Sequence, residues 1–392
     1  MSDGVAGLRV LSFGTAIAGN VTAMMLAELG ADVVKVESPA RPDPLRVRIY
    51  PDLPRVVEPG GAETNIMFAG FSRSVRDAAL DMKSPDDLAR FSALLAVADV
   101  LIDNYATGVM ERWGLDPARL AEVNPRLVHV SVSGYGRTGP KAHYMAYGSN
   151  INAYLGLSRV WASHGTQFDY TAVGHALVAV FAGLEERDRT GRGVTVDLAQ
   201  TEAGGAVMAP LYLDYLVNGG SASPGPNEVP GAVLSGVFPC RGHDEWLAVE
   251  LEDASDWAAA CTLLDRPDLA GHADAAGEMR AALTAWCAGL TPHQAMFRAQ
   301  RAGLAAGVVK DAEDLFLDPQ HRARGFAVTV NHPDLGPLDY GAPLHRFGRT
   351  AVGIRNPSPR VGEHTADVFA DWLTPSGEIA ASTLSEAHRR EA

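Results

Sequence analysis

Apolar and polar residues alternate at the start of the chain in a way that predicts a strand, a helix and a second strand. Residues 8–13 form a short apolar run, and residues 14–19 are a glycine-containing turn. In residues 20–29 the apolar side chains recur at helical spacing, and residues 31–37 are a second apolar run that ends in an acid. The pattern predicts a βαβ unit, and therefore a parallel sheet with right-handed crossovers.

The same pattern continues along the chain. Residues 98–103 and 127–132 are predicted strands, separated by a predicted helix over residues 116–123. A polar, glycine-rich stretch, residues 133–140, follows the second of these strands. Parallel sheets bind ligands beyond the carboxyl ends of their strands, so this stretch is a candidate ligand loop. A plain solvent loop is the equally acceptable alternative.

A long helix is predicted over residues 171–186, and its apolar residues predict that it is buried on most of its circumference. A strand is predicted over residues 194–198. Asp169 stands at the start of this helix. The ordinary explanation of an acid at that position is a helix N-cap, which contributes about 0.5–2 kcal/mol.

Composition shifts after this region. Residues 218–228 are rich in Gly, Pro and Ser and are predicted to be a linker. The predicted fold is α/β, with a large Rossmann-like parallel-sheet domain and a smaller α+β domain. Its expected parts are a large domain over residues 1–217, the linker, a small domain over residues 229–325, and a segment over residues 326–392 that completes the large domain and ends in a tail.

Charge and cysteine content narrow the function classes. The net charge of −14 disfavours a nucleic-acid or anionic-membrane binder, because such surfaces need a basic footprint. The three cysteines are widely spaced, which indicates neither a disulfide framework nor a structural zinc site. No signal-peptide pattern and no membrane-length apolar run are evident, so we expect a cytoplasmic protein.

The turn at residues 14–19 is not a dinucleotide or phosphate-loop motif. It reads Gly-Thr-Ala-Ile-Ala-Gly, which fits neither GxGxxG nor a loop followed by Lys and Ser or Thr. A structural turn between a strand and a helix is therefore the simpler interpretation. The free N–H groups at the helix start would still suit an anion or a carbonyl oxygen.

Short motifs follow one another in a fixed order along the chain, at residues 7–11, 18–19, 29–37, 80–85, 103–105, 111–114, 124–126, 133–136, 139–140, 190–193, 318–320, 323–325 and 362–365. Taken together, from residue 7 to about 372, they resemble the class III coenzyme A transferases, which include formyl-CoA transferase, carnitine CoA-transferase and the α-methylacyl-CoA racemases. The resemblance implies transfer of CoA from an acyl-CoA to a carboxylic acid, without ATP or a metal ion.

Asp169 matches the catalytic aspartate of that family. The resemblance implies that its carboxylate attacks the thioester, giving an aspartyl-acyl anhydride and then an aspartyl-CoA thioester. A helix N-terminus favours an ionised carboxylate, so capping and nucleophilic use are compatible.

The resemblance also carries over some CoA contacts. Arg112 matches an arginine that meets the cofactor's phosphates, and a solvated charge at a helix end is the less favoured alternative. Ala18 and Tyr147 match positions lining the pantetheine or acyl channel. Backbone N–H groups near Ala18 and Gly19, or in a glycine-containing loop of the smaller domain, are the candidate oxyanion donors, and the sequence leaves both open.

An acidic chain that binds anionic CoA needs a local basic site. Arg73 and Arg76, together with Arg112, are its candidates. Residues 72–77 depart from the Asn-x-Asn-Lys-Arg-Ser run of many family members. Ile17 replaces the glutamine of formyl-CoA transferase, and no glycine quadruplet occurs near residues 230–232, so a bulkier acid than oxalate is favoured.

Two alternatives stay open. A racemase would need a second acid/base group, but residues 147–152 contain no His where racemases carry one, and His143, His164 and His175 do not fit the motif. The other alternative is a non-catalytic subunit of a heteromeric transferase.

The family resemblance also implies the oligomeric state, an interlocked homodimer.

Overall fold

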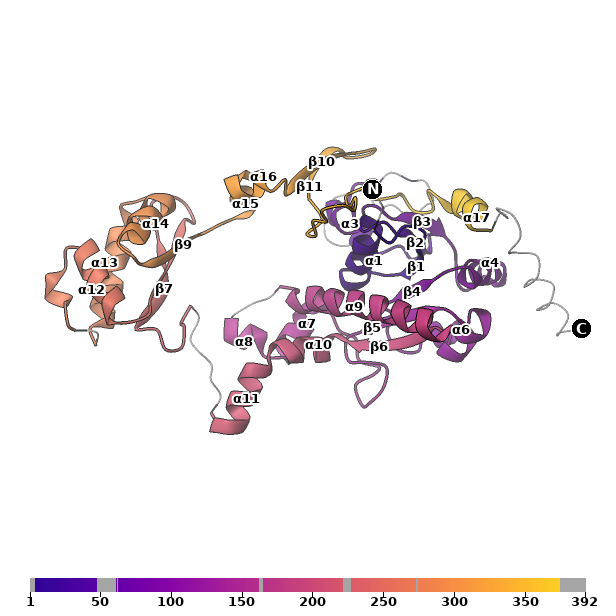
Figure 1. The fold of residues 1–392 in the computed structure, drawn as a ribbon, viewed down its shortest axis with the longest axis horizontal. Coiled ribbons are helices and arrows are strands. Elements are labelled where there is room, and N and C mark those ends of the chain that lie inside the picture. The colour runs from indigo at the N-terminus through magenta and orange to yellow at the C-terminus, as the bar shows by residue number, and fades with distance from the viewer. Residues whose placement is uncertain are drawn as a thin grey trace, which may run out of the picture. The chain divides into compact units, whose positions relative to one another are not determined.

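The computed structural model describes residues 4–47, 61, 63–161, 165–220, 227–272 and 274–373. His164, most of the predicted linker and the tail after residue 373 lie outside these ranges. The chain forms two compact units (Figure 1). The larger unit comprises residues 1–155, 165–209 and 325–392, and the smaller unit comprises residues 156–164 and 210–324. The domain limits expected from the sequence remain a prediction.

A six-stranded parallel sheet forms the centre of the larger unit, with strand order β3-β2-β1-β4-β5-β6 (Figure 1). Its strands are β1 (Arg9–Phe13), β2 (Asp32–Glu37), β3 (Arg76–Ala79), β4 (Val100–Asp103), β5 (Val128–Ser133) and β6 (Val194–Ala199). This is the doubly wound Rossmann order, so the predicted α/β class is confirmed. Its order reverses between β1 and β4, and the crevice outside their carboxyl ends is the usual ligand site of such sheets.

Helices cover both faces of this sheet because successive strand residues point to opposite sides. Val10 of β1 belongs to a core with α1 (Ala18–Glu28) and α9 (Gln167–Thr190). The next residue, Leu11, belongs to a second core with α4 (Pro85–Ala96), α6 (Pro117–Val123) and α17 (Thr365–Leu373). Both cores are apolar, and their burial fixes the sheet between its two helical layers.

The chain returns to the larger unit at Gly325. Two strands, β10 (Ala327–His332) and β11 (Gly336–Gly341), pair in antiparallel fashion. Further on, the backbone N–H of Gly362 donates to Asp77 Oδ1 at 2.6 Å. The shorter helices of this unit are α2 (Pro44–Val47), α3 (Ile66–Phe71), α5 (Val109–Arg112), α7 (Gly148–Tyr154) and α10 (Gln200–Val207).

A cluster of buried charges surrounds Arg46 of α2. Its guanidinium forms ion pairs with Glu37 at 3.0 Å, with Asp77 at 3.5 Å and with Glu63, and it stacks over the ring of Phe68. All four charged side chains have at most 5% of their surface exposed. Burial and the neighbouring Glu37 carboxylate raise the pKa of Asp77 well above its usual value. The three carboxyl groups therefore share the single positive charge of Arg46.

Helix α9 differs from its prediction in two ways. It begins at Gln167, so Asp169 lies in its first turn and the cap position belongs to Thr166. One face packs on the sheet, whereas on the other Val178 is 68% exposed and Phe181 is 39% exposed. The expectation of burial on most of its circumference is therefore wrong, because periodicity shows which side chains are apolar and not which of them meet a partner within the chain.

The smaller unit holds a three-stranded antiparallel sheet, in the order β7-β8-β9, packed against helices. Helix α8 (Leu157–Trp161) comes first in the chain. It is followed, between residues 209 and 323, by α11 (Ala209–Asn218), β7 (Leu234–Pro239), β8 (Trp246–Leu251), α12 (Ala254–Leu263), the 3₁₀ helix η1 (Pro267–Leu269), α13 (Ala276–Ala288), α14 (Pro292–Arg301), β9 (Ala305–Val309), α15 (Ala312–Leu317) and α16 (Pro319–Ala323). Cys240, Cys261 and Cys287 are free and buried in its core.

Candidate active site

Four of the six predicted CoA-contact residues, and Asp169 itself, lie in segments that leave the carboxyl ends of the parallel strands. Ala18 and Gly19 follow β1, Arg112 follows β4, and Tyr147 follows β5. Asp169 lies at the start of α9, which crosses from the loops after β5 to the start of β6. The fold thus places all five at one edge of the sheet, where doubly wound folds bind ligands.

The Asp169 carboxylate is buried in a small polar corner. Only 8% of the residue is exposed. Its Oδ1 accepts a hydrogen bond from Gln200 Nε2 at 2.7 Å. Its Oδ2 faces Gly148 so closely that a β-carbon on that residue would lie 2.4 Å from the oxygen. Gly148 is therefore needed here by close approach, and any larger side chain would displace the carboxylate.

Burial raises the pKa of the Asp169 carboxyl above its ordinary value of 3.8, and the hydrogen bond from Gln200 acts in the opposite direction. Among the residues that the structure describes, none forms an ion pair with this carboxylate. Its support comes from a neutral amide and from its place in the first turn of α9. Such a carboxylate is desolvated without being neutralised by a cation.

The turn before α1 is rigid and closely packed. A β-carbon on Gly19 would lie 2.5 Å from Gly14 Cα and 2.6 Å from Asn104 Oδ1. Asn104 accepts from the Thr15 N–H at 2.7 Å and donates to the Thr15 carbonyl at 2.8 Å. These bonds join the ends of β1 and β4, so Gly19 has a structural reason to be glycine whatever ligand the turn meets.

Lys35 of β2 holds the turn before α1 in place. Its ammonium donates to the carbonyl oxygen of Gly14, to Asn20 Oδ1 at 2.9 Å and to Asp43 Oδ2 at 2.9 Å. Both charged groups are buried. The pair fixes the start of α1 and with it the positions of Ala18 and Gly19.

The glycine-rich loop after β5 is anchored to the sheet. Arg137 Nη2 donates to Asp103 Oδ1 at 2.5 Å, and the Arg137 backbone N–H donates to Asp197 Oδ2 at 3.0 Å. His129 contributes a third contact, with its Nε2 2.7 Å from Asp103 Oδ2. The loop is therefore a fixed wall of the sheet edge, and the arginine within it is already paired with a carboxylate.

Arg112 and Tyr147 are both exposed at this edge. Arg112 ends α5, and Tyr147 is 53% exposed directly before Gly148. Arg112 forms no ion pair with any described residue, which leaves its guanidinium available to an anion. A phosphate group is the anion such an exposed fork binds well.

Arg73 and Arg76 lie elsewhere. Arg76 begins β3 and Arg73 precedes it, so both are at the amino edge of the sheet, opposite the carboxyl ends. Arg76 pairs with Asp32 and Asp371 at 2.5 and 2.7 Å, and Arg73 pairs with Glu28 at 2.7 Å. The geometry does not bring either arginine to Asp169, and their role as CoA contacts stays a prediction that this placement disfavours.

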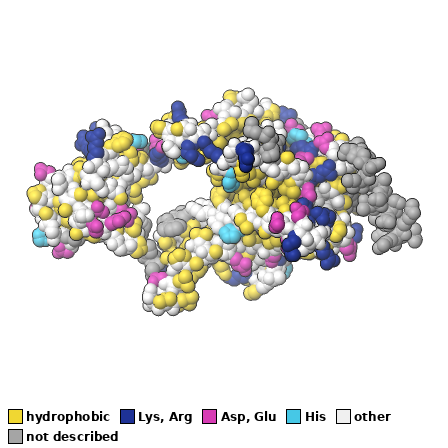
Figure 2. All heavy atoms as spheres, in the orientation of Figure 1, with side chains coloured by type: hydrophobic (Ala, Val, Ile, Leu, Met, Phe, Trp, Pro, Cys, Tyr) yellow, Lys and Arg dark blue, Asp and Glu magenta, His cyan; other side chains and the backbone are white. Residues whose placement is uncertain are grey.

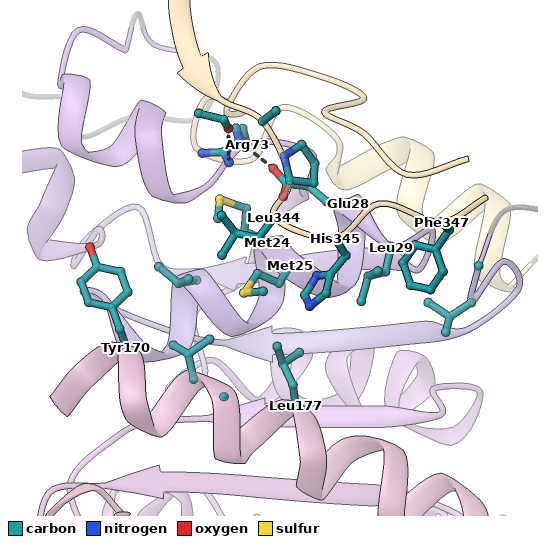
Figure 3. Close-up of a pocket in the computed structure, with 18 of the residues that line it drawn as sticks. Met24, Met25, Glu28, Leu29, Arg73, Tyr170, Leu177, Leu344, His345 and Phe347 are labelled. Carbon is teal, nitrogen blue, oxygen red and sulfur yellow. Dashed lines mark hydrogen bonds and ion pairs between the residues drawn. The ribbon is translucent and has the colours of Figure 1, made fainter. Parts of the chain in front are cut away.

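The Arg73–Glu28 pair borders a largely apolar pocket of about 970 Å³ between α1, α9 and residues 341–350 (Figure 3). Met24, Met25 and Leu177 line it, and Tyr170 extends into it from α9 (Figure 3). Hydrophobic side chains gather over this face of the larger unit (Figure 2). Asp169 is not among its lining residues and contacts α7 and α10 instead.

Sequence reasoning missed Gln200 and Gly148. Gly148 directly follows the candidate Tyr147, and Gln200 lies two residues after the end of the strand predicted over residues 194–198. A polar residue immediately after the carboxyl end of a parallel strand is the signal that marks Gln200, because such positions face the ligand edge.

Comparison with known proteins decides the family. Residues 5–365 match the family described as CoA-transferase family III. The chain belongs to CoA-transferase family III. Enzymes of this family act on CoA thioesters and carboxylic acids.

Curated relatives carry matching names. A Mycobacterium tuberculosis protein named "Probable CoA-transferase Rv1866" is 30% identical over 97% of this chain, which spans only half of that relative's length. The Succinyl-CoA--D-citramalate CoA-transferase of Chloroflexus aurantiacus is 27% identical, with 93% of each chain covered.

The fold of this CoA-transferase family III chain also has a solved counterpart. A CAIB/BAIF family protein from Brucella suis superposes with a TM-score of 0.83 at 26% identity, covering 95% of this chain and all of that one. Among the described residues, no group of three or more His, Cys, Asp or Glu side chains is placed to hold a metal ion. No described helix is long and apolar enough to cross a membrane.

Proposed function

We propose that this protein is a class III CoA-transferase that moves CoA from an acyl-CoA donor to a carboxylic acid, with Asp169 as the nucleophile. The observation that carries the proposal is the Asp169 carboxylate, which is buried at the ligand edge of a Rossmann sheet and hydrogen-bonded by a neutral amide. Family membership supports CoA as the group transferred.

The chemistry follows from this environment. A carboxylate oxygen of Asp169 attacks the thioester carbonyl, the C–S bond breaks, and an aspartyl-acyl anhydride and CoA thiolate result. The thiolate then attacks Cγ of Asp169, which releases the donor acid and leaves an aspartyl-CoA thioester. The acceptor acid reverses these steps, so one difficult exchange becomes several easier ones.

The surroundings of Asp169 suit a nucleophile. Water hydrates an exposed carboxylate and a cation neutralises a paired one, and both lower its reactivity. Here burial removes most of the water, and the described residues supply no cation. Arg112, exposed at the same edge, is the proposed contact for the phosphates of CoA, and Tyr147 and the turn at Ala18 and Gly19 are the proposed walls of the channel.

Succinyl-CoA is the first donor to test. Relatives named for succinyl-CoA transfer to D-citramalate, L-malate and glutarate are 25–29% identical to this chain. Purified protein is incubated with succinyl-CoA and a panel of carboxylic acids, and new thioesters are identified by mass. Formation of an acceptor-CoA without ATP supports the proposal, and its absence with every donor and acid would contradict it.

A racemase is the alternative, and deuterium uptake from the solvent tests it separately from CoA transfer. Racemisation needs a proton-exchanging group on each side of the α-carbon. Of the histidines in the described part of this region, His143 is exposed, and His129 is buried against Asp103. His175 is exposed on α9 with its ring bonded to the Thr171 carbonyl. Deuterium uptake at the α-carbon without CoA exchange would favour the racemase.

Assembly is part of the proposal. Helix α11 has no buried residue, and Leu213, Leu216 and Val217 on it are 58, 74 and 79% exposed. Such an apolar helix supports the interlocked homodimer that the family resemblance implies. Two relatives are named alpha and beta subunits of one transferase, so activity of the purified chain alone would separate a catalytic homodimer from a non-catalytic subunit.

The cytoplasm is the proposed location of the protein.

A further inference from the structure

The two oxygens of Asp169 have different neighbours. Oδ1 accepts from Gln200 Nε2 at 2.7 Å. Oδ2 instead faces the backbone of Gly148, where the missing side chain leaves room. A carboxylate is chemically symmetric in water, so this difference comes entirely from the protein.

Gln200 is held in place by tight packing around it. It is the first residue of α10, directly after β6, and is itself only 6% exposed. The N–H of the next residue, Thr201, donates to the Gly134 carbonyl at 3.0 Å. One turn later, Gly204 lies so close to α9 that a β-carbon on it would be 2.7 Å from the Phe168 ring. The amide of Gln200 therefore has a fixed position relative to Asp169.

We propose that Gln200 assigns different tasks to the two oxygens of Asp169: Oδ2 attacks the acyl carbon, and Oδ1 stays on the Gln200 amide and becomes the oxyanion when CoA thiolate adds to Cγ. This inference rests on the proposed function. It makes Gln200 a catalytic residue, since its N–H contacts a reacting atom, and it names one oxyanion donor of the reaction.

The atoms of each step follow from this assignment. Thiolate addition to Cγ forms the C–S bond and places negative charge on Oδ1. Collapse breaks the bond from Cγ to Oδ2, so the departing donor acid carries Oδ2 away. The acceptor acid then attacks Cγ through one of its own oxygens and expels the thiolate. When the thiolate removes the acceptor's acyl group, that acceptor oxygen stays on the enzyme as the new Oδ2.

Isotope labelling tests the assignment directly. The enzyme turns over many times with unlabelled acyl-CoA and an excess of acceptor acid that carries ¹⁸O in both oxygens of its reacting carboxylate. The peptide containing Asp169 is then analysed by mass spectrometry. We expect the wild-type peptide to gain one ¹⁸O and never two, because Oδ1 does not exchange places with Oδ2 between turnovers.

The Gln200→Ala variant should behave differently. Without the amide, the carboxylate can turn between turnovers, so its peptide should gain two ¹⁸O atoms. Loss of one oxyanion donor should also slow formation of the aspartyl-CoA adduct by about 10²–10³-fold. Asn152→Ser is the matched control: it removes another buried amide, which bonds Gly165 and Gln167 and not Asp169, and it should still gain only one label.

The outcomes separate this inference from the proposed function. Two labels in the wild type, one label in Gln200→Ala, or two labels in Asn152→Ser would each overturn the role of Gln200 while leaving Asp169 as the nucleophile. No label in the wild type during measured CoA transfer would overturn the anhydride mechanism and this inference together.

A second variant covers the case in which Gln200→Ala is too slow to label. Gln200→Glu keeps the shape of the side chain but donates a hydrogen bond only when the introduced carboxyl group is protonated. Its activity relative to the wild type should therefore rise as the pH is lowered. A ratio that stays constant with pH would contradict a donor role for Gln200.

Discussion

Two buried acidic regions of the larger unit differ in how their charge is compensated. Around Arg46, the carboxylates of Glu37, Glu63 and Asp77 share one guanidinium deep in the fold. Asp169, near the ligand edge, has only the neutral amide of Gln200 among the described residues. Burial alone therefore does not mark a reactive acid; burial without a cationic partner is the feature that distinguishes Asp169.

The largest effect is expected at the uncompensated acid. Asp169→Asn keeps the size of the side chain but removes the attacking charge, so CoA transfer should fall by at least about 10⁴-fold, as for loss of other covalent nucleophiles. The rate is measured by acceptor-CoA formation, with CoA affinity measured in parallel as the control. Activity within tenfold of the wild type would show that Asp169 is not the nucleophile, and the absence of a cationic partner would then not mark a reactive acid.

A change in the Arg46 cluster should lower the free energy of unfolding. Arg46→Met leaves three buried carboxylates without their cation, which should cost about 3–5 kcal/mol of folding free energy. Thermal and denaturant unfolding measure the loss. Arg90→Met is the control, because its partner Asp87 lies 3.1 Å away on the surface and such pairs contribute at most about 1 kcal/mol. Equal effects of the two changes would contradict the structural role of the Arg46 cluster.

The space beside Asp169 provides a smaller and more local test. Gly148→Ala places a methyl group where Oδ2 lies, so the carboxylate must move and activity should drop by about 10²-fold. Gly174→Ala on α9 is the matched control, since its added β-carbon meets nothing within 4 Å. The two variants are compared by kcat/KM and by melting temperature, and similar kcat/KM values would show that Oδ2 needs no room.

The smallest effect concerns pH. Burial raises the pKa of Asp169, so its ionisation at neutral pH costs folding free energy, and Asp169→Asn should melt at a higher temperature than the wild type. The difference should shrink as the pH falls through the raised pKa and vanish below the unfolded-state value of about 3.8, where both side chains are neutral. Melting curves across that range measure it, and a difference that does not depend on pH would contradict the raised pKa.

Much of the fold could be predicted because its signals are local. The apolar runs of β1 and β2 and the helical spacing of α1 are each contained within a dozen residues, and Gly30 ends that helix. The apolar period predicts a start at residue 171, whereas α9 begins at Gln167, because Gln167 and Asp169 are polar and add nothing to that period.

The candidate active site is formed by contacts between residues far apart in the sequence, which no local pattern can predict. The family resemblance and a place at a helix start indicate Asp169. Gln200 is 31 residues away and meets Asp169 only because β6 lies beside β5 in the sheet. Only their charge indicates Arg73 and Arg76, whereas strand β3, which Arg76 begins, places both at the amino edge with carboxylate partners. Charge can be read from a sequence, but the edge on which it lies requires the topology.

The most direct test of Asp169 as the nucleophile is the intact mass of the enzyme after mixing with an acyl-CoA donor and no acceptor. We predict a covalent adduct with the mass of CoA less one water, located on the peptide that contains Asp169 and absent from Asp169→Asn. An enzyme that transfers CoA without such an adduct, or that carries it on another residue, would contradict the account.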